Sequence, residues 1–491
     1  MTENTLAPSS SPQSNADAAT TPALTGRMSM GALLLTVLAF SAPIAVVAGY
    51  IPFTISFGGP AATLIFIMAT VFLLLFAVGY VTMAKSLPKP GSFYAFISAG
   101  LGKIPGLGGA FLAVVSYLLM LGGCYVFIGL TANEFIASLD GPEIPWWVWT
   151  IASWLIVSVM CYFHIEVSAK VLSVAMLLEI AIVLVFNVAV LVHGGGPEGF
   201  SATPLNPAEL SNGDIGVAML FAIMVFLGFE ATALFRDEVR DPDKTIPRAT
   251  YGAVLFVGTL YIVSCYLLTT AYGSNAVETA TNDPKSMFPD AIGNLAAPVF
   301  TQLTFLFIIT SELAAAISVH NVTARYAYNL GVDNALPAWL ARVHPRHHSP
   351  YRASVTVAAV VAVILVILSL ANTAGEGLDA QLFGLGTVGV LVLMCLVSLS
   401  VIGWFARRGI SNGGNVFKCF IAPALAVIAL GTTVVLAVMH LDLVVGGAPG
   451  QNTGLLFILA ASLLCGSVLA VYFRARKPEV FRRLGRADVA G

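Results

Sequence analysis

The stretch ALLLTVLAFSAPIAVVAGYIPFTISF, residues 32–57, decides the fold. It is long enough to cross a bilayer, whose hydrocarbon core needs about 20 apolar residues in a helix. Its middle, however, holds Ser41-Ala42-Pro43, and Gly49 and Pro52 follow. Proline removes a helical N–H donor and clashes with the preceding turn. The sequence therefore predicts a membrane helix that is broken near its centre.

The composition of the whole chain extends this picture. Of 491 residues, 58% are hydrophobic and only 10% are charged, whereas soluble domains carry about 25% charged residues. The composition predicts a polytopic, all-helical membrane protein. The net charge of −2 leaves no basic excess for binding nucleic acid. Six cysteines without a CxxC spacing predict neither a disulfide framework nor a metal site, and we expect no cofactor.

Twelve apolar runs are long enough to span the membrane. When the N-terminus is placed inside and the direction alternates, all Lys and Arg residues except Lys285 fall on the cytoplasmic side, as the positive-inside rule requires. This sorting favours twelve spans with both termini in the cytoplasm. The predicted spans are 31–55, 60–85, 107–137, 146–163, 168–192, 215–235, 248–272, 295–325, 353–371, 381–405, 417–440 and 454–473.

A second interruption, Gly228-Phe229-Glu230, lies in the sixth span, about 187 residues after the first. Adding the same shift of about 187 residues to the bounds of the third span gives the bounds of the eighth. Spans 1–5 and spans 6–10 are therefore predicted to be two copies of one five-helix unit, with inverted topology. Matched interruptions in two halves are typical of a transporter binding site. The alternative is that these glycines and prolines serve helix packing.

A broken helix exposes N–H groups at one half-helix and C=O groups at the other, with partial charges of about +0.5 and −0.5. The N–H groups can hold a carboxylate and the C=O groups an ammonium. An amino-acid zwitterion satisfies both ends. We therefore expect Ser41, Ala42, Pro43 and Ile44, together with Gly228, Phe229 and Glu230, to contact the substrate.

Four acids fall within predicted spans: Glu134, Glu179, Glu230 and Glu312. A charge at the bilayer centre costs about 2.5–3.5 kcal/mol, so such residues usually face a cavity and act there. Glu230 is expected to contact the substrate amine; the alternative is that it caps the broken helix. Glu179 is expected to carry a coupled proton, because burial disfavours the charged form of a carboxyl; the alternative is a permanently protonated group. Glu134 lies near a span end, where solvation also explains it.

Span 8 supplies a polar stripe. Ser311 and Ser318 are seven residues apart and therefore lie on one helix face. Ser311 is a candidate substrate ligand, and Ser318 is a candidate residue for proton coupling. For both, helix packing is the alternative. Glu312 points about 100° away from Ser311, toward the edge of the site or a proton path. Tyr125 on span 3 is a candidate for closing the site from the side, or an ordinary core tyrosine.

Four stretches resemble the amino acid–polyamine–organocation (APC) superfamily of permeases, in its bacterial amino acid permease branch. They are Ser41-Ala42-Pro43, LPKPGSFYAFISAGLG (Leu87–Gly102), GFEATALFRDEVRDPDKTIPRA (Gly228–Ala249) and HNVTARYAYNLGVDNALP (His320–Pro337). The resemblance covers about residues 28–475. It implies a LeuT-like fold of five-plus-five inverted repeats plus two C-terminal helices, a site between spans 1, 3, 6, 8 and 10, and alternating access.

Two positions depart from the family's pattern. Many members have a glycine-rich segment in span 1 whose N–H groups take the substrate carboxylate, and here Pro43 replaces one possible donor. Many proton-coupled members carry a lysine in the middle of span 5, where alignment places Glu179. The first departure weakens the expected carboxylate contact. The second places an acid where the family's proton-coupling group is basic.

The expected function is secondary active transport of an amino acid across the cytoplasmic membrane, coupled to proton import and without enzymatic activity. A polyamine or monoamine carrier, or an amino acid/amine exchanger, is the alternative; an uncoupled channel or a sensor ranks below both. Residues 1–27 are expected to form a disordered cytoplasmic tail and 476–491 a basic one. The transporter domain then covers 28–475, with repeats over 31–192 and 215–405 and extra helices over 417–473.

Overall fold

The computed structural model describes residues 30–87, 92–163, 169–230, 232, 239, 241–344, 349–371, 377–410, 414–445 and 453–485. Within these ranges the chain is built from helices joined by loops, and no strand is assigned there; isolated bridge residues, such as the pair Gly196 and Gly199, are the nearest approach to one. The prediction of an all-helical protein is confirmed. The predicted tail over residues 1–27 lies outside the described residues, as does the end of the predicted basic tail.

The predicted spans coincide with helices or broken pairs of helices. The first span comprises α1 (Met30–Ser41), α2 (Pro43–Ala45), a π-helical turn (Val46–Tyr50) and α3 (Ile51–Gly58), and the sixth contains the short α9 (Ile215–Met224). The other spans are α4 (Ala62–Ser86), α6 (Lys103–Ala137), α7 (Trp146–Tyr162), α8 (Ala169–Val192), α10 (Pro242–Tyr272), α13 (Val299–Val332), α14 (Tyr351–Ala371), α15 (Leu378–Arg408), α16 (Ala422–Met439) and α18 (Thr453–Arg476).

Shorter helices connect these elements. They are α5 (Phe93–Gly100), α11 (Ala276–Asn282), α12 (Met287–Leu295), α17 (Leu441–Val445) and α19 (Pro478–Arg483). Among the described residues, nine helices are long and apolar enough to cross a membrane, and two shorter apolar ones, α7 and α9, accompany them. The protein is thus a polytopic membrane protein, and the number of twelve crossings stays a prediction.

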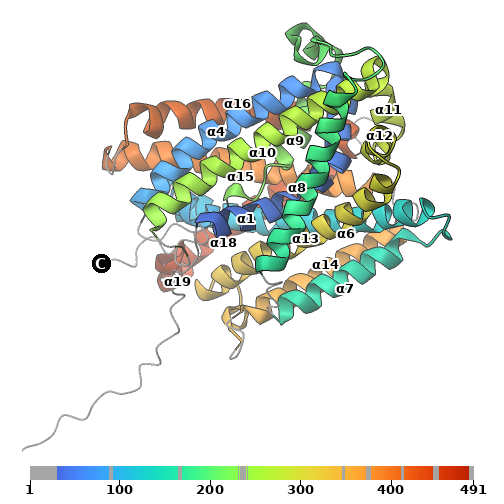
Figure 1. Cartoon of the computed structure of the whole chain (residues 1–491). Helices are drawn as coiled ribbons and strands as arrows, with labels where there is room; N and C mark the ends of the chain where they lie inside the picture. Colours follow the sequence, from blue (N-terminus) through green and yellow to red (C-terminus); the bar gives the residue numbers. More distant parts are fainter. Residues whose placement is uncertain are drawn as a thin grey trace, which may run out of the picture.

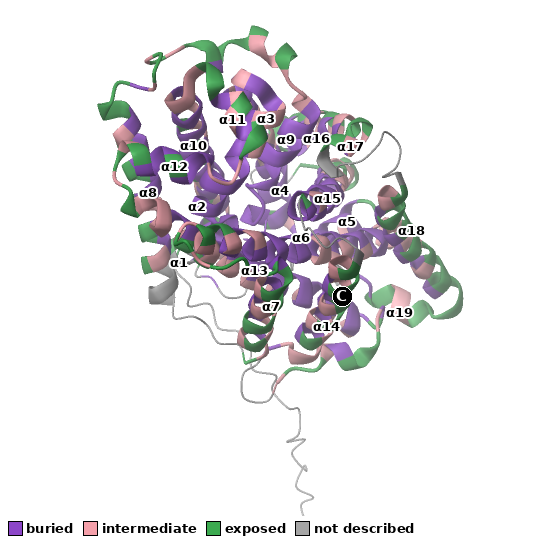
Figure 2. Ribbon diagram, turned by 90° about the vertical axis from the view of Figure 1, so that its right-hand side faces the viewer, coloured by how far each residue is buried: buried purple, intermediate pink, exposed green. Residues whose placement is uncertain are grey.

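The core gathers around α6. This helix packs against α13, α15 and α18, while α10 packs against α4 and α1 (Figure 1). Figure 2 shows α4, α6 and α15 mostly buried, whereas α7, α14 and α18 carry the exposed residues. Many of those exposed residues are large and apolar, as expected of surfaces that face lipid. They include Leu155, Val159, Val363, Ile367, Phe457 and Leu464.

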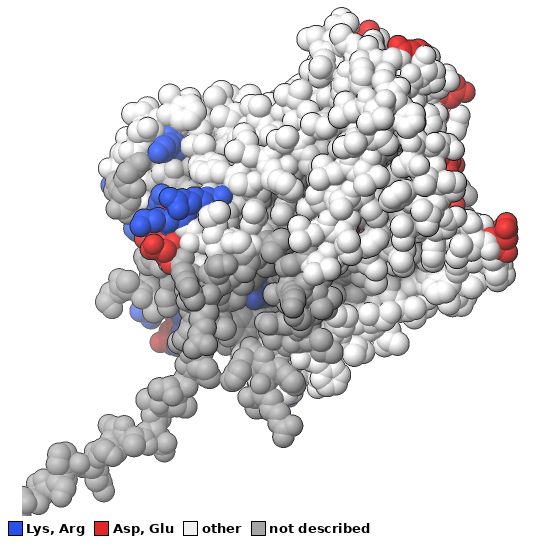
Figure 3. Space-filling view, viewed as in Figure 1, with Lys and Arg blue, Asp and Glu red and all other residues white. Residues whose placement is uncertain are grey.

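In the view of Figure 3, Lys and Arg residues gather at one end of the molecule, with some acidic residues beside them, and other acidic residues lie at the opposite end. Basic residues end several helices at one end, which we call the basic end: Lys85, Arg407, Arg408, Arg474, Arg476, Arg482 and Arg483. Acidic residues occupy the first turns of helices at the other, the acidic end: Glu209, Glu278, Asp290 and Asp442.

Candidate functional site

The first break is a single residue wide. α1 ends at Ser41 and α2 begins at Pro43, and between them Ala42 adopts the left-handed conformation with φ 43° and ψ 66°. Non-glycine residues rarely adopt this conformation, because Cβ then crowds the backbone. The carbonyl of Ser41, freed by the break, accepts a hydrogen bond from the Tyr261 hydroxyl at 3.1 Å. The predicted interruption of the first span is therefore present.

The second break lies where α9 ends. After Met224 the chain turns through Gly228, whose φ of 116° favours glycine. A Cβ atom at Gly228 would lie 2.6 Å from Cγ and 2.7 Å from Cβ of Phe40, the residue before Ser41. The two breaks are thus in direct contact, although they are far apart in the sequence.

Glu230 is held by its own break and by two neighbouring helices. One carboxylate oxygen accepts a hydrogen bond from the Gly228 N–H at 2.7 Å, and the other accepts one from the Tyr117 hydroxyl at 3.0 Å. The backbone carbonyl of Glu230 accepts the Tyr80 hydroxyl at 2.6 Å. This arrangement matches the helix-capping alternative, and contact with a substrate amine stays a prediction. Phe229 is buried and packs edge-on against Phe76.

Glu179 joins three elements at the first break. Its carboxylate accepts the Ser311 hydroxyl of α13 at 2.6 Å, and it also hydrogen-bonds to the backbone N–H of Ile44 in α2. The Glu179 side chain itself belongs to α8 and is 4% exposed. The Ile44 N–H at the start of this half-helix is therefore already bound to a carboxyl of the protein.

The remaining predicted residues of span 8 separate. Glu312 is 2% exposed and hydrogen-bonds to the Cys124 thiol of α6, on a different side of α13 from Ser311. Ser318 is half-buried and donates to the Ala314 carbonyl of its own helix at 3.0 Å. The structure therefore brings Ser311 to Glu179 but leaves the Ser318 hydroxyl bonded within α13.

Tyr125 lies in the core. Its ring is fully buried, its hydroxyl has no hydrogen-bond partner, and its backbone carbonyl accepts the Thr150 hydroxyl of α7 at 3.1 Å.

Two further residues sit beside these groups and were not among the predicted ones. Asp379, in the first turn of α15, is 1% exposed, and neither carboxylate oxygen has a hydrogen-bond partner. Tyr50, at the end of the π-helical turn, also has a buried hydroxyl without a partner. Electrostatic interactions link Tyr50 and Asp379 to Glu312.

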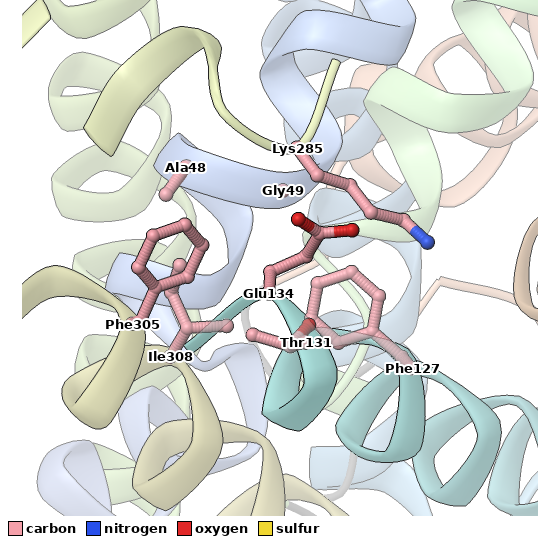
Figure 4. Close-up of a pocket in the computed structure, with 8 residues that line it drawn as sticks. All are labelled: Ala48, Gly49, Phe127, Thr131, Glu134, Lys285, Phe305 and Ile308. Atoms are coloured by element: carbon pink, nitrogen blue, oxygen red, sulfur yellow. The ribbon is translucent and has the colours of Figure 1, made fainter. Parts of the chain in front are cut away.

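Glu134 lines a pocket of about 210 Å³ between α6, α13 and the π-helical turn (Figure 4). The side chain of Glu134 and that of Lys285, from the loop between α11 and α12, lie on one side of this pocket. The apolar lining on the other sides comprises Ala48, Gly49, Phe127, Phe305 and Ile308, with Thr131 beside Glu134. Among the described residues, no group of three or more His, Cys, Asp or Glu side chains is arranged to hold a metal ion.

Comparisons with known proteins agree with this architecture. The sequence profile of the amino acid permease family matches residues 33–481. The branched-chain amino acid permease BcaP of Bacillus subtilis is 24% identical over 389 residues, which cover 76% of this chain and 79% of BcaP. The low-affinity putrescine importer PlaP of Escherichia coli is 23% identical over 348 residues, which cover 69% of this chain and 72% of PlaP.

A solved structure shows the same fold. MhsT in complex with L-phenylalanine superposes with a TM-score of 0.58 at 14% identity, covering 82% of this chain and 98% of MhsT. The LeuT-like fold expected from the sequence is confirmed at this level.

Proposed function

Because the chain belongs to the amino acid permease family, we propose that it moves an amino acid across the cytoplasmic membrane by alternating access, with proton import as the driving force. Family membership and the fold shared with MhsT support secondary transport. The relative BcaP, a branched-chain amino acid permease, supports an amino acid as the substrate. The segregation of charge supports the placement of both termini in the cytoplasm, at the basic end.

The observation that carries the proposal is the position of Glu179. Its carboxyl ties α8 to Ser311 on α13 and to the Ile44 N–H at the first break. An ionised carboxylate holds such an N–H more strongly than a protonated one, because hydrogen bonds to charged groups are about twice as strong as neutral ones. Protonation of Glu179 would then release the Ile44 N–H for the substrate carboxylate. Binding of the proton and of the substrate would thereby favour each other.

The proposed substrate site lies between the two breaks. Ser41, Ala42, Pro43 and Ile44 form one wall, and Gly228, Phe229 and Glu230 form the other. Ser311, Glu312 and Tyr125 complete the substrate site, and Ser318 is assigned with Glu179 to proton coupling.

An amine carrier is the second candidate. Pro43 has no N–H, and the Ile44 N–H already binds Glu179. Recognition of a substrate carboxylate is thereby weakened, while the buried acids favour a cation. The relative PlaP, a putrescine importer, supports this candidate.

Electrogenic currents test the proposal. The purified chain is reconstituted into proteoliposomes on a solid-supported membrane, without sodium, and is given amino acids or their decarboxylated amines. We expect currents with branched-chain amino acids that grow with an inward proton gradient. Currents with amines alone would move the assignment to the amine carrier. Currents that persist without any matching gradient would indicate a channel, and silence with both substrate classes would contradict proton-coupled amino acid import.

A further inference from the structure

A second cluster of buried polar groups adjoins the proposed substrate site and shares none of the hydrogen bonds of Glu179 and Glu230. Its centre is Asp379, which is 1% exposed and whose two carboxylate oxygens have no hydrogen-bond partner. A carboxylate taken out of water without a partner is strongly destabilised. The buried Asp379 carboxyl therefore lacks the polar partner that such a group needs, and a cationic ligand would supply one.

Tyr50 gives independent evidence of a missing ligand. Its hydroxyl is buried without a partner, and it interacts electrostatically with both Glu312 and Asp379. Two rings fix the phenol in place: Phe127 stacks on it with centroids 5.0 Å apart, and Phe383 meets it edge-on at 5.3 Å. Because the ring is held on both sides, rotation of Tyr50 toward another partner is hindered.

The cluster matches an alkylammonium group. An ammonium carries one positive charge and three N–H donors, and the cluster offers two carboxyls and one hydroxyl as acceptors. Aromatic faces around Tyr50 add cation–π attraction and apolar surface for the adjoining methylene groups. A metal ion is less well matched, because one of the groups, Glu312, is hydrogen-bonded to the Cys124 thiol and the described acids form no metal-binding group.

A path from the acidic end leads toward the cluster. The pocket in Figure 4 is lined by Gly49, which precedes Tyr50, and by Phe127, which stacks on Tyr50. Ile308 lies in the same lining, one helical turn from Glu312. Glu134 supplies a negative charge to this pocket, and Lys285 a positive one. The pocket therefore adjoins residues that neighbour or contact Tyr50.

We propose that Asp379, Glu312 and Tyr50 form a binding site for the primary ammonium group of an alkylamine, distinct from Glu230. Diamines and the side chains of basic amino acids share this chemistry. The inference rests on the proposed transport function and deepens it, because it names the chemical group, a primary ammonium, that this part of the substrate site takes.

Binding measurements on the full chain test this site. Isothermal titration in potassium phosphate buffer, free of amines and sodium, uses n-butylamine, 1,4-diaminobutane and L-lysine as probes. We expect Asp379→Asn to weaken binding at least about tenfold, since it removes a charged partner. Tyr50→Phe keeps the ring contacts and removes one hydroxyl, so a loss of about twofold to tenfold is expected.

Ser398→Ala is the matched control. Ser398 is another buried side chain of α15 whose oxygen has no partner, and it lies 19 residues, or about 28 Å, from Asp379. Its substitution should leave binding unchanged. Size-exclusion profiles and thermal unfolding establish that each variant is folded, and Tyr50→Phe keeps the test valid if Asp379→Asn does not fold.

The outcomes separate the two proposals. Probe affinities that are equal in wild type, Asp379→Asn and Tyr50→Phe would overturn the site, and so would stabilisation by sodium alone that depends on Asp379. Binding of L-lysine without 1,4-diaminobutane would support the site and identify a basic amino acid as the source of the ammonium; the reverse would identify a diamine. Leucine currents that survive in a variant without amine binding would leave the transport proposal intact. Amine binding by a wild type that transports nothing would refute only the transport proposal.

Discussion

Replacing Gly228 by alanine is expected to damage the second break in two ways. A φ of 116° is unfavourable for a residue with a Cβ atom, at a cost of about 1–2 kcal/mol. The new methyl group would also lie 2.6 Å from Cγ and 2.7 Å from Cβ of Phe40, and overpacking of this kind costs about 1–3 kcal/mol. Gly228→Ala should therefore lower the free energy of unfolding by about 2–5 kcal/mol.

Thermal unfolding in detergent measures this loss. A thiol-reactive fluorophore reports it, because Cys124, Cys161, Cys265 and Cys419 are buried in the folded state. At about 2 °C per kcal/mol, the lower end for larger domains, Tm should fall by about 4–10 °C. Transport should fall as well, because the Gly228 N–H holds the Glu230 carboxylate.

Two comparisons make the result specific. Gly252 lies within α10, and a Cβ there would meet nothing within 4 Å, so Gly252→Ala should stabilise the helix by about 0.5–1 kcal/mol. Gly228→Ala combined with Phe40→Ala should lose less than the sum of the two single changes, because part of the clash is removed. A Gly228→Ala protein as stable and active as Gly252→Ala would refute the claim that the breaks depend on this contact.

Three further predictions concern other contacts. Glu179→Gln keeps an acceptor for the Ser311 hydroxyl but cannot release a proton. Proton-driven currents should therefore vanish, while substrate exchange measured by counterflow persists. Unchanged currents would exclude Glu179 from proton coupling. The hydroxyl and N–H of Ser274 lower the pKa of Glu198 below its usual 4.5. This contact therefore stabilises the fold above that pH and is lost as pH falls through the lowered pKa, so Glu198→Gln should reduce Tm at pH 6 but not at pH 3. Asp214 caps α9 through the Val217 N–H at 2.9 Å and pairs with His440; Asp214→Ala should cost about 1 kcal/mol in unfolding free energy, and an unaltered unfolding curve would contradict the capping role.

The two breaks could be located from the local sequence, because proline and glycine determine the backbone conformation at their own positions. Pro43 cannot continue the preceding helix, and Gly228 permits a φ that other residues avoid. Long apolar runs likewise predicted the helices, since the bilayer sets their length. None of these signals depends on which helices become neighbours.

Contacts between distant residues were beyond such reasoning. Glu179 and Ser311 were both candidates, yet their hydrogen bond joins residues 132 positions apart and depends on how α8 packs against α13. The sequence predicted that Glu230 either contacts a substrate amine or caps the broken helix, and its hydrogen bond from the Gly228 N–H matches the capping alternative. The direction of a side chain at a broken helix is set by tertiary partners such as Tyr117, which no local pattern reveals.

Asp379 was not among the predicted site residues, because the predicted start of the tenth span was placed too late in the sequence. The tenth span was predicted to begin at residue 381, which left Asp379 just outside the membrane, whereas α15 begins at Leu378. Helix ends inferred from hydropathy are uncertain by a few residues. An acid within three residues of a predicted end therefore merits the same scrutiny as one inside the span.

The two breaks differ in mechanical stiffness. The first turns on Ala42, a residue that resists its left-handed backbone, and the second on Gly228, a residue that accepts a positive φ freely. A hinge residue held in an unfavourable backbone conformation stores conformational energy, which is released when its surroundings change. A glycine hinge changes its backbone angles at little energetic cost. We therefore expect the half-helices to bend continuously at the second break. At the first break we expect them to switch between discrete conformations. Spin-label distances across each break would resolve this asymmetry as a narrow, two-peaked distribution at Ala42 and a broad one at Gly228.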